Sequence, residues 1–336
     1  MIGYYVHHRG SGHLHRALAV ASEMDAAVTI LSSLPRPASW TGGWVQLPLD
    51  TDADPVDVTA GGALHWVPLD SAGLSDRMSA ISHWLAEYRP TTVVVDVSVE
   101  VSALVRLHGI RVVTYAQPGD RRDAAHNFGY QMASAIIAPW PTEFRPSEVA
   151  QTVAQNLVHV GSISRFRVSP TLQRPDPGLL RIAVMNGSGG RGQSALETVV
   201  AEAQAAVPGA VWVWLIGKSS DQIEHELRSV SLVFAHCGQN AVAEIAACRT
   251  PAILVPEDRP HEEQHQFASA ISTSDFPAVV CNPGEGVDWA SIISHAHSLD
   301  GQRWSHFVDG RAAERAAAVI SRVAASAHRG PGWKAA

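Results

Sequence analysis

The chain has little cysteine and no long apolar run. Its three cysteines, Cys237, Cys248 and Cys281, form no CxxC pair. An odd number without paired spacing argues against a disulfide framework, so we expect a reducing, cytoplasmic setting. No apolar stretch approaches the roughly 18 residues of a membrane-spanning helix, and the N-terminus opens directly on a strand pattern. We therefore expect neither a signal peptide nor a transmembrane helix, although peripheral membrane contact stays compatible with the sequence.

Runs of like charge are also missing. The 25 basic and 32 acidic residues are interspersed and give a formal net charge of -7. A nucleic-acid partner requires a concentrated basic surface, so we expect none. The length of 336 residues exceeds the usual size of a single hydrophobic core, which predicts two domains.

Short apolar runs alternate with segments of helical length along the whole chain. This alternation is typical of parallel sheets with helices on both faces. We predict an α/β protein with two Rossmann-like, doubly wound parallel-sheet domains that face a cleft. The strands expected in the first half are Ile2–Val6, Ala27–Leu31, Val93–Val97, Arg111–Tyr115 and Ala135–Ala138. Those expected in the second half are Leu180–Met185, Val211–Ile216, Ser231–Ala235, Ala252–Val255 and Ala278–Cys281.

A linker separates the two halves. Three prolines and a glycine in residues 169–178 indicate an irregular connection. We predict an N-terminal domain over residues 1–165 and a C-terminal domain over 166–303. We expect residues 304–326 to form a long helix that can cross back to the N-terminal domain, and residues 327–336 to be a disordered tail.

A glycine turn in the second half suits a bound diphosphate. Ser231–Ala235 reads as a buried strand, and Val242 and Ile245 recur at helical spacing beyond the turn. Gly238 permits a sharp turn and a close approach to a ligand, and the helix N-terminus beyond it offers unpaired N–H groups to phosphate oxygens. The alternative is an ordinary strand-to-helix turn in which His236 is a core histidine.

A second glycine turn follows the first strand. Gly10, Gly12 and His13 precede a helix pattern, but position 15 is a histidine, so the third glycine of a dinucleotide fingerprint is missing. His13 lies at the expected helix N-terminus, where the helix dipole favours the neutral imidazole that acts as a base. The alternative is a capping or solvated histidine.

Charged residues follow two other strands of the first half. Asp96 and Glu100 flank the end of one strand, where a carboxylate can assist His13 as a base or simply begin the next helix. Arg121 and Arg122 follow another strand and can grip an anion, or form a solvated pair.

A third glycine-rich segment follows the first strand of the second half. Its glycines allow the backbone to approach a diphosphate, and its arginine can add a charged contact. The alternative is a surface turn. The candidate diphosphate-binding residues in this segment are Asn186, Gly187, Ser188, Gly189 and Arg191.

These segments together resemble the signatures of GT-B nucleotide-sugar glycosyltransferases. Within that group the chain most resembles the MurG-like family, whose C-terminal domain is of the glycosyltransferase family 28 type. The residues from His236 to Glu244 resemble the donor box HCGxN(S/T)xxE, and the residues from Gly10 to Arg16 resemble the loop GxGHxxR. Residues 186–192 are similar to the family's GGSxG loop. The resemblance implies an acceptor-side N-terminal domain and a donor-binding C-terminal domain.

The resemblance also assigns residues to the donor. It implies that Glu244 binds ribose, while the diphosphate lies against the other residues of the box, which are His236, Gly238, Gln239, Asn240 and Ala241. Gly12 of the first loop is implied near the reacting centre, beside the donor. The segment that ends in Ala270 resembles (D/Q)QxxNA, which implies that His265 and Gln266 hold the sugar hydroxyls. Ala241 replaces the usual serine or threonine, and residues 217–228 are too few for the family's base-binding loop.

The function implied is an inverting, metal-independent hexosyltransferase without a cofactor. Its donor is a nucleotide-diphosphate sugar, with UDP and dTDP expected first, and its acceptor is a small molecule, a glycan or a lipid-linked hydroxyl, in cell-envelope or secondary-metabolite glycosylation. Two alternatives stay open: a nucleotide-sugar hydrolase that uses water, and a non-catalytic nucleotide-binding partner of another transferase. His261 and His265 also lie four residues apart, but no third zinc ligand is evident, so we expect no metal.

Overall fold

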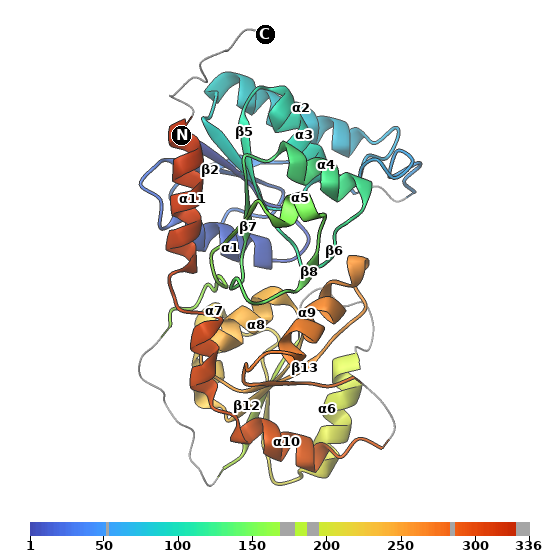
Figure 1. The fold of residues 1–336 in the computed structure, drawn as a ribbon, viewed down its shortest axis with the longest axis vertical. Coiled ribbons are helices and arrows are strands. Elements are labelled where there is room, and N and C mark those ends of the chain that lie inside the picture. The colour runs from blue at the N-terminus through green and yellow to red at the C-terminus, as the bar shows by residue number, and fades with distance from the viewer. Residues whose placement is uncertain (52–53, 169–178, 187–194, 283–285, 327–336) are drawn as a thin grey trace.

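The computed structural model describes residues 1–51, 54–168, 179–186, 195–282 and 286–326. Figure 1 shows two lobes, of which the upper contains the N-terminal half of the chain and the lower contains most of the C-terminal half. The predicted linker at 169–178 and the predicted tail at 327–336 lie outside the described residues. In the part of the chain that is described, no helix is both long enough and apolar enough to cross a membrane.

The N-terminal lobe is built on a seven-stranded sheet in which every neighbouring pair is parallel. The strand order is β3-β2-β1-β4-β5-β7-β9. In this order the strands are β3 (Gly43–Gln46), β2 (Val28–Ser32), β1 (Ile2–Tyr5), β4 (Thr92–Val95), β5 (Arg111–Tyr115), β7 (Ala135–Ala138) and β9 (Leu157–His159). The fully buried run of β4, Thr-Val-Val-Val, is the composition expected of a central strand covered on both faces.

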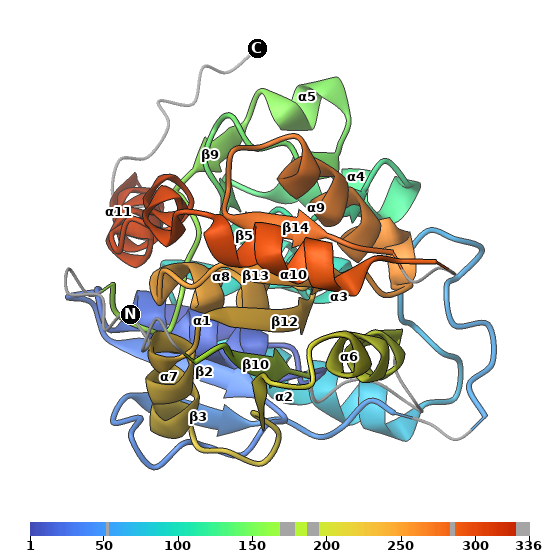
Figure 2. The ribbon, with the colours of Figure 1, turned by 90° about the horizontal axis from the view of Figure 1, so that it is seen from below.

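The C-terminal lobe repeats the plan with five parallel strands. The order is β11-β10-β12-β13-β14. In this order the strands are β11 (Val211–Trp214), β10 (Arg181–Met185), β12 (Leu232–His236), β13 (Ala252–Val255) and β14 (Ala278–Val280). Figure 2 views the molecule from the side of this lobe. The predicted α/β class with two doubly wound parallel sheets is confirmed.

Both sheets reverse their direction of growth at a defined point. In the first sheet the chain adds β2 and β3 on one side of β1 and then places β4 on the other side. In the second sheet β10 and β12 are the corresponding neighbours. Ligands of open α/β sheets bind at such switch points, outside the carboxyl ends of the strands. The residues that follow β1, β4, β10 and β12 are therefore the ones expected to form a site.

The helices connect the strands and cover both faces of each sheet. Two short 3-10 helices, η1 (Pro260–Glu262) and η2 (Gly301–His306), lie in the second half of the chain. The helices of the N-terminal lobe are α1 (Gly12–Ala21), α2 (Ala72–Tyr88), α3 (Val99–Leu107), α4 (Ala124–Met132) and α5 (Gln151–Ala154). The later helices are α6 (Ala195–Ala206), α7 (Ser220–Ser229), α8 (Gln239–Ala247), α9 (Glu263–Ser272), α10 (Trp289–Ser298) and α11 (Ala312–Ser326).

The end of the described chain lies on the N-terminal lobe. Ala316 and Ile320 of α11 pack with Ile2 of β1 and Val20 of α1 in one apolar core, and Figure 1 shows α11 beside the upper lobe. The prediction of a single helix over residues 304–326 is wrong. The chain forms η2, breaks, and starts α11 only at Ala312, because Gly310 takes a positive φ of 82° between them.

Four strands were not expected from the sequence. The edge strands β3 and β9 extend the first sheet, and both are short and only partly buried. β6 (Gly119–Asp120) and β8 (Ser147–Glu148) form a separate parallel pair. Elements of two to four residues on a sheet edge carry almost no apolar periodicity, so their sequences give little signal.

Candidate active site

A buried ion pair organises the N-terminal side of the site. Asp96 follows β4 and is fully buried, and both of its oxygens receive hydrogen bonds from the Arg16 guanidinium of α1. Arg16 also lies over the ring of Tyr115, with 4.7 Å from Cζ to the ring centroid. Because β1 and β4 are neighbours at the switch point, the helix after one strand and the carboxylate after the other meet.

His13 joins this pair at the first turn of α1. Its Nδ1 lies 3.2 Å from Oδ2 of Asp96. Nη2 of Arg16 also lies 3.2 Å from this nitrogen, but a guanidinium only donates and a carboxylate only accepts, so Nδ1 can bond to one of the two at a time. In the contact with Asp96 the proton is on Nδ1 and the lone pair is on Nε2. Burial would raise the pKa of Asp96, but the charge of Arg16 and the contact with His13 outweigh it and hold that pKa below its usual value. Asp96 is therefore an anion that orients the imidazole.

The N-terminus of α8 forms the opposite wall. Gly238 is the N-cap of this helix and has no side chain to cap it, so the first-turn N–H groups stay available to a ligand. A cavity of about 180 Å³ separates this turn from the N-terminal lobe. Its lining residues are His13, Arg16, Gln117, Gly238, Gln239, Asn240, Ala241 and Glu263. The cavity thus brings the candidate base and the candidate phosphate turn together across the two lobes.

The lobes approach each other closely beside this cavity. A Cβ built on Gly12 would lie 2.2 Å from Nδ2 of Asn240, so only glycine fits there without displacing that amide. Gln239 bridges the lobes, because its Nε2 donates to the Pro139 carbonyl at 3.2 Å and its Oε1 accepts from Arg16 at 3.5 Å. The side chain of Gln239 is therefore engaged in holding the lobes together, while its backbone N–H belongs to the uncapped first turn of α8.

His236 ends β12 behind the glycine turn. Its Nδ1 donates to the Val255 carbonyl at 3.1 Å, which fixes the tautomer. Its Nε2 is buried and has no hydrogen-bond partner among the described residues. His236 is not among the residues that line the 180 Å³ cavity, so its expected contact with the diphosphate stays a prediction.

Glu244 is already paired. It is 5% exposed, and its carboxylate forms an ion pair with Arg165, in which Nη2 donates a hydrogen bond at 3.1 Å and Nε lies 2.8 Å from the other oxygen. Burial raises the pKa of Glu244, and the charge of Arg165 offsets that effect only in part. Arg165 also lies 3.3 Å from Nε2 of His15 and over the ring of Phe166. Ribose binding by Glu244, as the resemblance implies, requires Arg165 to give way.

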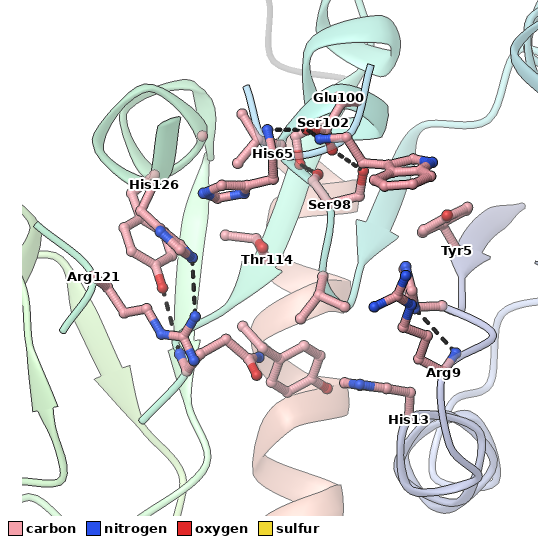
Figure 3. A pocket seen from close by; sticks show the side chains of 18 of the residues that line it. Tyr5, Arg9, His13, His65, Ser98, Glu100, Ser102, Thr114, Arg121 and His126 are labelled. Atoms are coloured by element: carbon pink, nitrogen blue, oxygen red, sulfur yellow. Dashed lines mark hydrogen bonds between the residues drawn. The ribbon is translucent and has the colours of Figure 1, made fainter. Parts of the chain in front are cut away.

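A larger cavity of about 350 Å³ lies beside His13, and most of the residues that line it belong to the N-terminal lobe. Figure 3 shows Arg9 and His13 on one side of it and Arg121 and His126 on the other. Its apolar wall includes Tyr5, Trp66, Leu74, Met78 and Tyr130. The combination of an apolar wall and a few polar groups is typical of a small-molecule site.

Glu100 holds the loop over this cavity. Its Oε1 accepts from the backbone N–H groups of His65 and Trp66 at 2.7 and 3.0 Å, and its Oε2 accepts from the Ser98 hydroxyl at 2.8 Å. These bonds occupy the carboxylate with loop contacts, whereas the other candidate carboxylate, Asp96, touches His13. The structure therefore brings His13 together with Asp96 and not with Glu100.

The two residues expected to hold the donor sugar do not line either cavity, and that role stays a prediction. His265 is exposed and pairs with Asp258 at 2.7 Å, and Gln266 lies 3.4 Å from Glu148 of the N-terminal lobe. Glu263 instead lines both cavities. Glu263 and Gln264 also fit the first two positions of (D/Q)QxxNA, with Phe267 in place of the asparagine and Ala268 at the last position.

The third glycine segment is described only at its start. Asn186 follows β10, and its Nδ2 donates to Glu197 of α6 at 3.2 Å. The predicted donor residues Gly187, Ser188, Gly189 and Arg191 lie outside the described residues.

Three histidines on the wall of the larger cavity form, with Asp123, a group that has the chemistry of a metal site. His65, Asp123, His126 and His261 place one ligand atom each within 4.8 Å of all the others. No periodic pattern in the sequence indicates this group, because the four residues come from three separate segments. Of the two histidines considered for zinc from the sequence, only His261 belongs to this group.

The comparisons with known proteins agree with this geometry. Residues 216–280, which contain β12, α8 and α9, match the glycosyltransferase family 28 C-terminal domain. The whole chain is similar to MurG from Acinetobacter baumannii, with 15% identity, a TM-score of 0.61, and coverage of 96% of this chain and 99% of that one. This is a GT-B glycosyltransferase fold.

Two other solved glycosyltransferase structures are also similar along nearly the full length of both chains. The calicheamicin glycosyltransferase CalG4 shares 17% identity at a TM-score of 0.64, over 98% of this chain and 99% of that one. The spinosyn rhamnosyltransferase SpnG, solved with thymidine diphosphate, shares 14% at 0.55, over 97% and 96%. No curated protein sequence matches the chain. The GT-B fold thus rests on structure along the full chain and on sequence only in the C-terminal lobe.

Proposed function

We propose that this protein is an inverting glycosyltransferase that moves a sugar from a nucleotide-diphosphate donor to the hydroxyl group of a small acceptor. The observation that carries the proposal is the 180 Å³ cavity in which His13, oriented by Asp96, faces the uncapped first turn of α8. A base on one lobe and a phosphate-binding turn on the other are the two parts that a direct displacement needs.

The reaction follows from these positions. Nε2 of His13 accepts the proton of the acceptor hydroxyl while its oxygen forms a bond to the anomeric carbon. The bond from that carbon to the donor phosphate breaks, and its electron pair leaves with the diphosphate. The backbone N–H groups of Gln239, Asn240 and Ala241 receive the departing charge. A single displacement inverts the anomeric configuration.

The helix terminus replaces the metal ion in this scheme. Preorganised N–H groups at the positive end of a helix stabilise a developing anion without a bound cation. Ala241, where relatives carry a hydroxyl residue, leaves that stabilisation to the backbone alone. We accordingly expect turnover to be indifferent to added Mg²⁺ or Mn²⁺.

The larger cavity supports a compact acceptor. Its volume of about 350 Å³ is at the lower end of the roughly 300–1,000 Å³ typical of small-molecule sites. An apolar wall with Trp66 and Tyr130 fits a hydroxylated molecule that carries an apolar ring system, and such a wall has no use in a hydrolase that admits only water. The transferase is therefore favoured over the hydrolase.

Fewer observations bear on which nucleotide and which sugar the donor carries. UDP and dTDP sugars are the first donors to test, since solved GT-B neighbours hold UDP in one case and thymidine diphosphate in another. Glu244 is proposed for the ribose, and Glu263 replaces His265 and Gln266 as the candidate for the sugar hydroxyls.

The proposal is tested by product stereochemistry. The protein is incubated with UDP- and dTDP-sugars and a panel of aromatic and alicyclic alcohols, and the anomeric configuration of the product is read by NMR. We expect an acceptor-dependent product of inverted configuration, formed at the same rate with and without Mg²⁺. A retained configuration, or release of sugar to water at an acceptor-independent rate, would overturn it.

A further inference from the structure

Three imidazoles surround one carboxylate where the two lobes meet. Nδ1 of His126 contacts Oδ2 of Asp123, Nε2 of His65 lies 3.3 Å from Oδ1, and Nδ1 of His261 lies 3.8 Å from Oδ2. The ring centroids are 4.3 Å apart for His65 and His126, and 4.8 Å apart for His126 and His261. Each ring thus presents a nitrogen toward the same point.

We propose that His65, Asp123, His126 and His261 form a zinc site that joins the N-terminal lobe to the C-terminal lobe. His65 and the pair Asp123 and His126 belong to the first lobe, and His261 belongs to η1 of the second. The proposal stands apart from the proposed function, because it concerns how the lobes are held and not how the sugar is transferred.

The donor set selects the metal. Three imidazole nitrogens and one carboxylate oxygen are borderline ligands that suit Zn²⁺ in a four-coordinate site, whereas Mg²⁺ and Ca²⁺ prefer oxygen ligands only. The four ligand atoms lie within 4.8 Å of one another, so small side-chain rotations bring them to the roughly 2.0–2.2 Å bonds of zinc.

The backbone presents His261 to the other lobe at a conformational cost. His261 and Glu262 both take left-handed φ values, of 62° and 55°, which residues with a Cβ adopt rarely. Gly119 of β6 receives this segment, because a Cβ there would lie 2.3 Å from the His261 carbonyl oxygen. The absence of a side chain at position 119 lets η1 reach the N-terminal lobe.

Hydrogen bonds to neighbouring groups hold the segments that carry the other three proposed ligands. Asp123 is the N-cap of α4 and accepts from the His126 N–H at 3.0 Å, which places both residues on one helix turn. The His65 backbone N–H donates to Glu100 at 2.7 Å, which fixes the loop that carries it. Such supporting bonds commonly set ligand geometry and metal affinity.

Among the residues that the structure describes, Arg121 is the cation that contacts this group and opposes a bound metal ion. Its Nη1 lies 3.3 Å from Nε2 of His126, and a zinc bond through Nδ1 would turn that nitrogen into an N–H donor. Arg121 can give up this contact because Nη2 pairs with Glu263 at 3.3 Å and Nε donates to the Pro118 carbonyl at 2.8 Å. Glu263 also offsets its positive charge.

Direct zinc binding tests the proposal on the full chain. The protein is freed of metal, titrated with Zn²⁺ in competition with a chromophoric chelator, and analysed for bound metal after gel filtration. We expect one zinc per chain and a higher melting temperature with Zn²⁺ than without. His126→Ala and His261→Ala should each weaken binding by on the order of 100-fold or more, beyond the effect of losing a supporting bond.

The controls separate ligation from misfolding. Asp123→Asn keeps an oxygen that caps α4 and should still weaken zinc binding, while His297→Ala, at an exposed histidine of α10, should leave it unchanged. Co²⁺ in place of Zn²⁺ should give the intense visible absorption of a tetrahedral site in the wild type and not in His126→Ala. Binding of less than one zinc, or equal affinity in wild type and His261→Ala, would overturn the proposal, whatever the transferase assay shows.

Discussion

At the scale of single residues, the site depends on buried charges that are held in pairs. Arg16 with Asp96 and Arg165 with Glu244 are buried or nearly so, and each pair joins segments far apart in the sequence. Removing one partner of such a pair leaves an uncompensated charge in a region that excludes water. These residues therefore affect stability and function together, and the two effects must be measured separately.

Asp96→Asn is expected to lower both quantities. The variant leaves the Arg16 guanidinium without its counter-ion, so the free energy of unfolding should fall by about 3–5 kcal/mol in urea denaturation. Loss of the carboxylate also removes the group that orients His13, and kcat should fall by about 100-fold. Asp275→Asn, which breaks an exposed pair with Arg303, should change stability by less than about 1 kcal/mol. Equal stability of the two variants would contradict the buried-pair account.

Arg165→Met tests the role of Glu244. Without Arg165 the buried carboxylate has lost its partner, so the melting temperature of the free protein should fall. If Glu244 binds ribose, the two ribose hydroxyls donate to the carboxylate that the mutation leaves unpaired. The rise in melting temperature on adding UDP or dTDP should then be larger in the variant than in the wild type. An equal or smaller rise would remove Glu244 from the ribose site.

His7 gives the fold a dependence on pH. Burial, with His13 and His8 nearby, lowers the pKa of His7 to about 3, against about 6.5 in an unfolded chain. Between these values the unfolded state binds a proton that the folded state does not, so stability falls as the pH falls from 6.5 toward 3. Each such proton contributes a slope of about 1.4 kcal/mol per pH unit.

The measurement compares the wild type with His7→Gln, whose amide oxygen can accept from the Arg9 N–H as the Nδ1 of His7 does. Urea denaturation at pH 4.5, 5.5 and 6.5 should give a shallower loss of stability in the variant. Parallel curves would show that His7 titrates alike in the folded and unfolded states.

At the scale of elements, the buried strands were predictable and the edges were not. Runs such as Val93–Val97 and Ala252–Val255 are apolar without alternation, because helices cover both faces of the sheet. The short edge strand Gly43–Gln46 has a glycine and an exposed end, and nothing in its pattern separates it from a loop. The break before α11 was not predicted, because the alanine-rich sequence from Ala312 onward favours one long helix and does not indicate the left-handed turn at Gly310.

The site was predictable where it depends on local order and not where it depends on cross-lobe contact. His13 and the turn at Gly238 each sit at a strand-glycine-helix sequence that is visible in the chain. Arg165 and Glu263 act through partners about 80 and 140 residues away in the sequence, and no local pattern reports such pairs. The same holds for the histidines around Asp123.

The last helix is expected to stabilise the N-terminal lobe, although it follows the C-terminal lobe in the chain. Ile320 is fully buried among residues of β1 and α1. Ile320→Ala should lower the free energy of unfolding by about 2–5 kcal/mol, through lost burial and the cavity that remains. Ser321→Ala, at the next and exposed position of α11, should change it by less than about 0.5 kcal/mol. A loss shared equally by both variants would mean that α11 is not packed as described.

At the scale of the whole molecule, the two sheets present their switch points to each other. The first turn of α1 after β1 and Gln117 after β5 face the glycine turn after β12, so both lobes supply residues to the cavity lined by His13 and Asn240. The lobes touch at Gly12 and again at Gly119, where only glycine fits against the other lobe. A donor bound in this cavity would contact both lobes at once.

The most direct test of this account separates binding from turnover in His13→Ala. Nucleoside diphosphate release is followed for wild type, His13→Ala and the exposed control His83→Ala, with UDP- and dTDP-sugars and hydroxylated acceptors, beside the thermal shift that each nucleotide produces. The account predicts acceptor-dependent release that falls by about 100-fold or more in His13→Ala alone, with the thermal shift unchanged in all three proteins. Release that is unaffected by His13→Ala, or absent from a wild type that still binds the nucleotide, would contradict it.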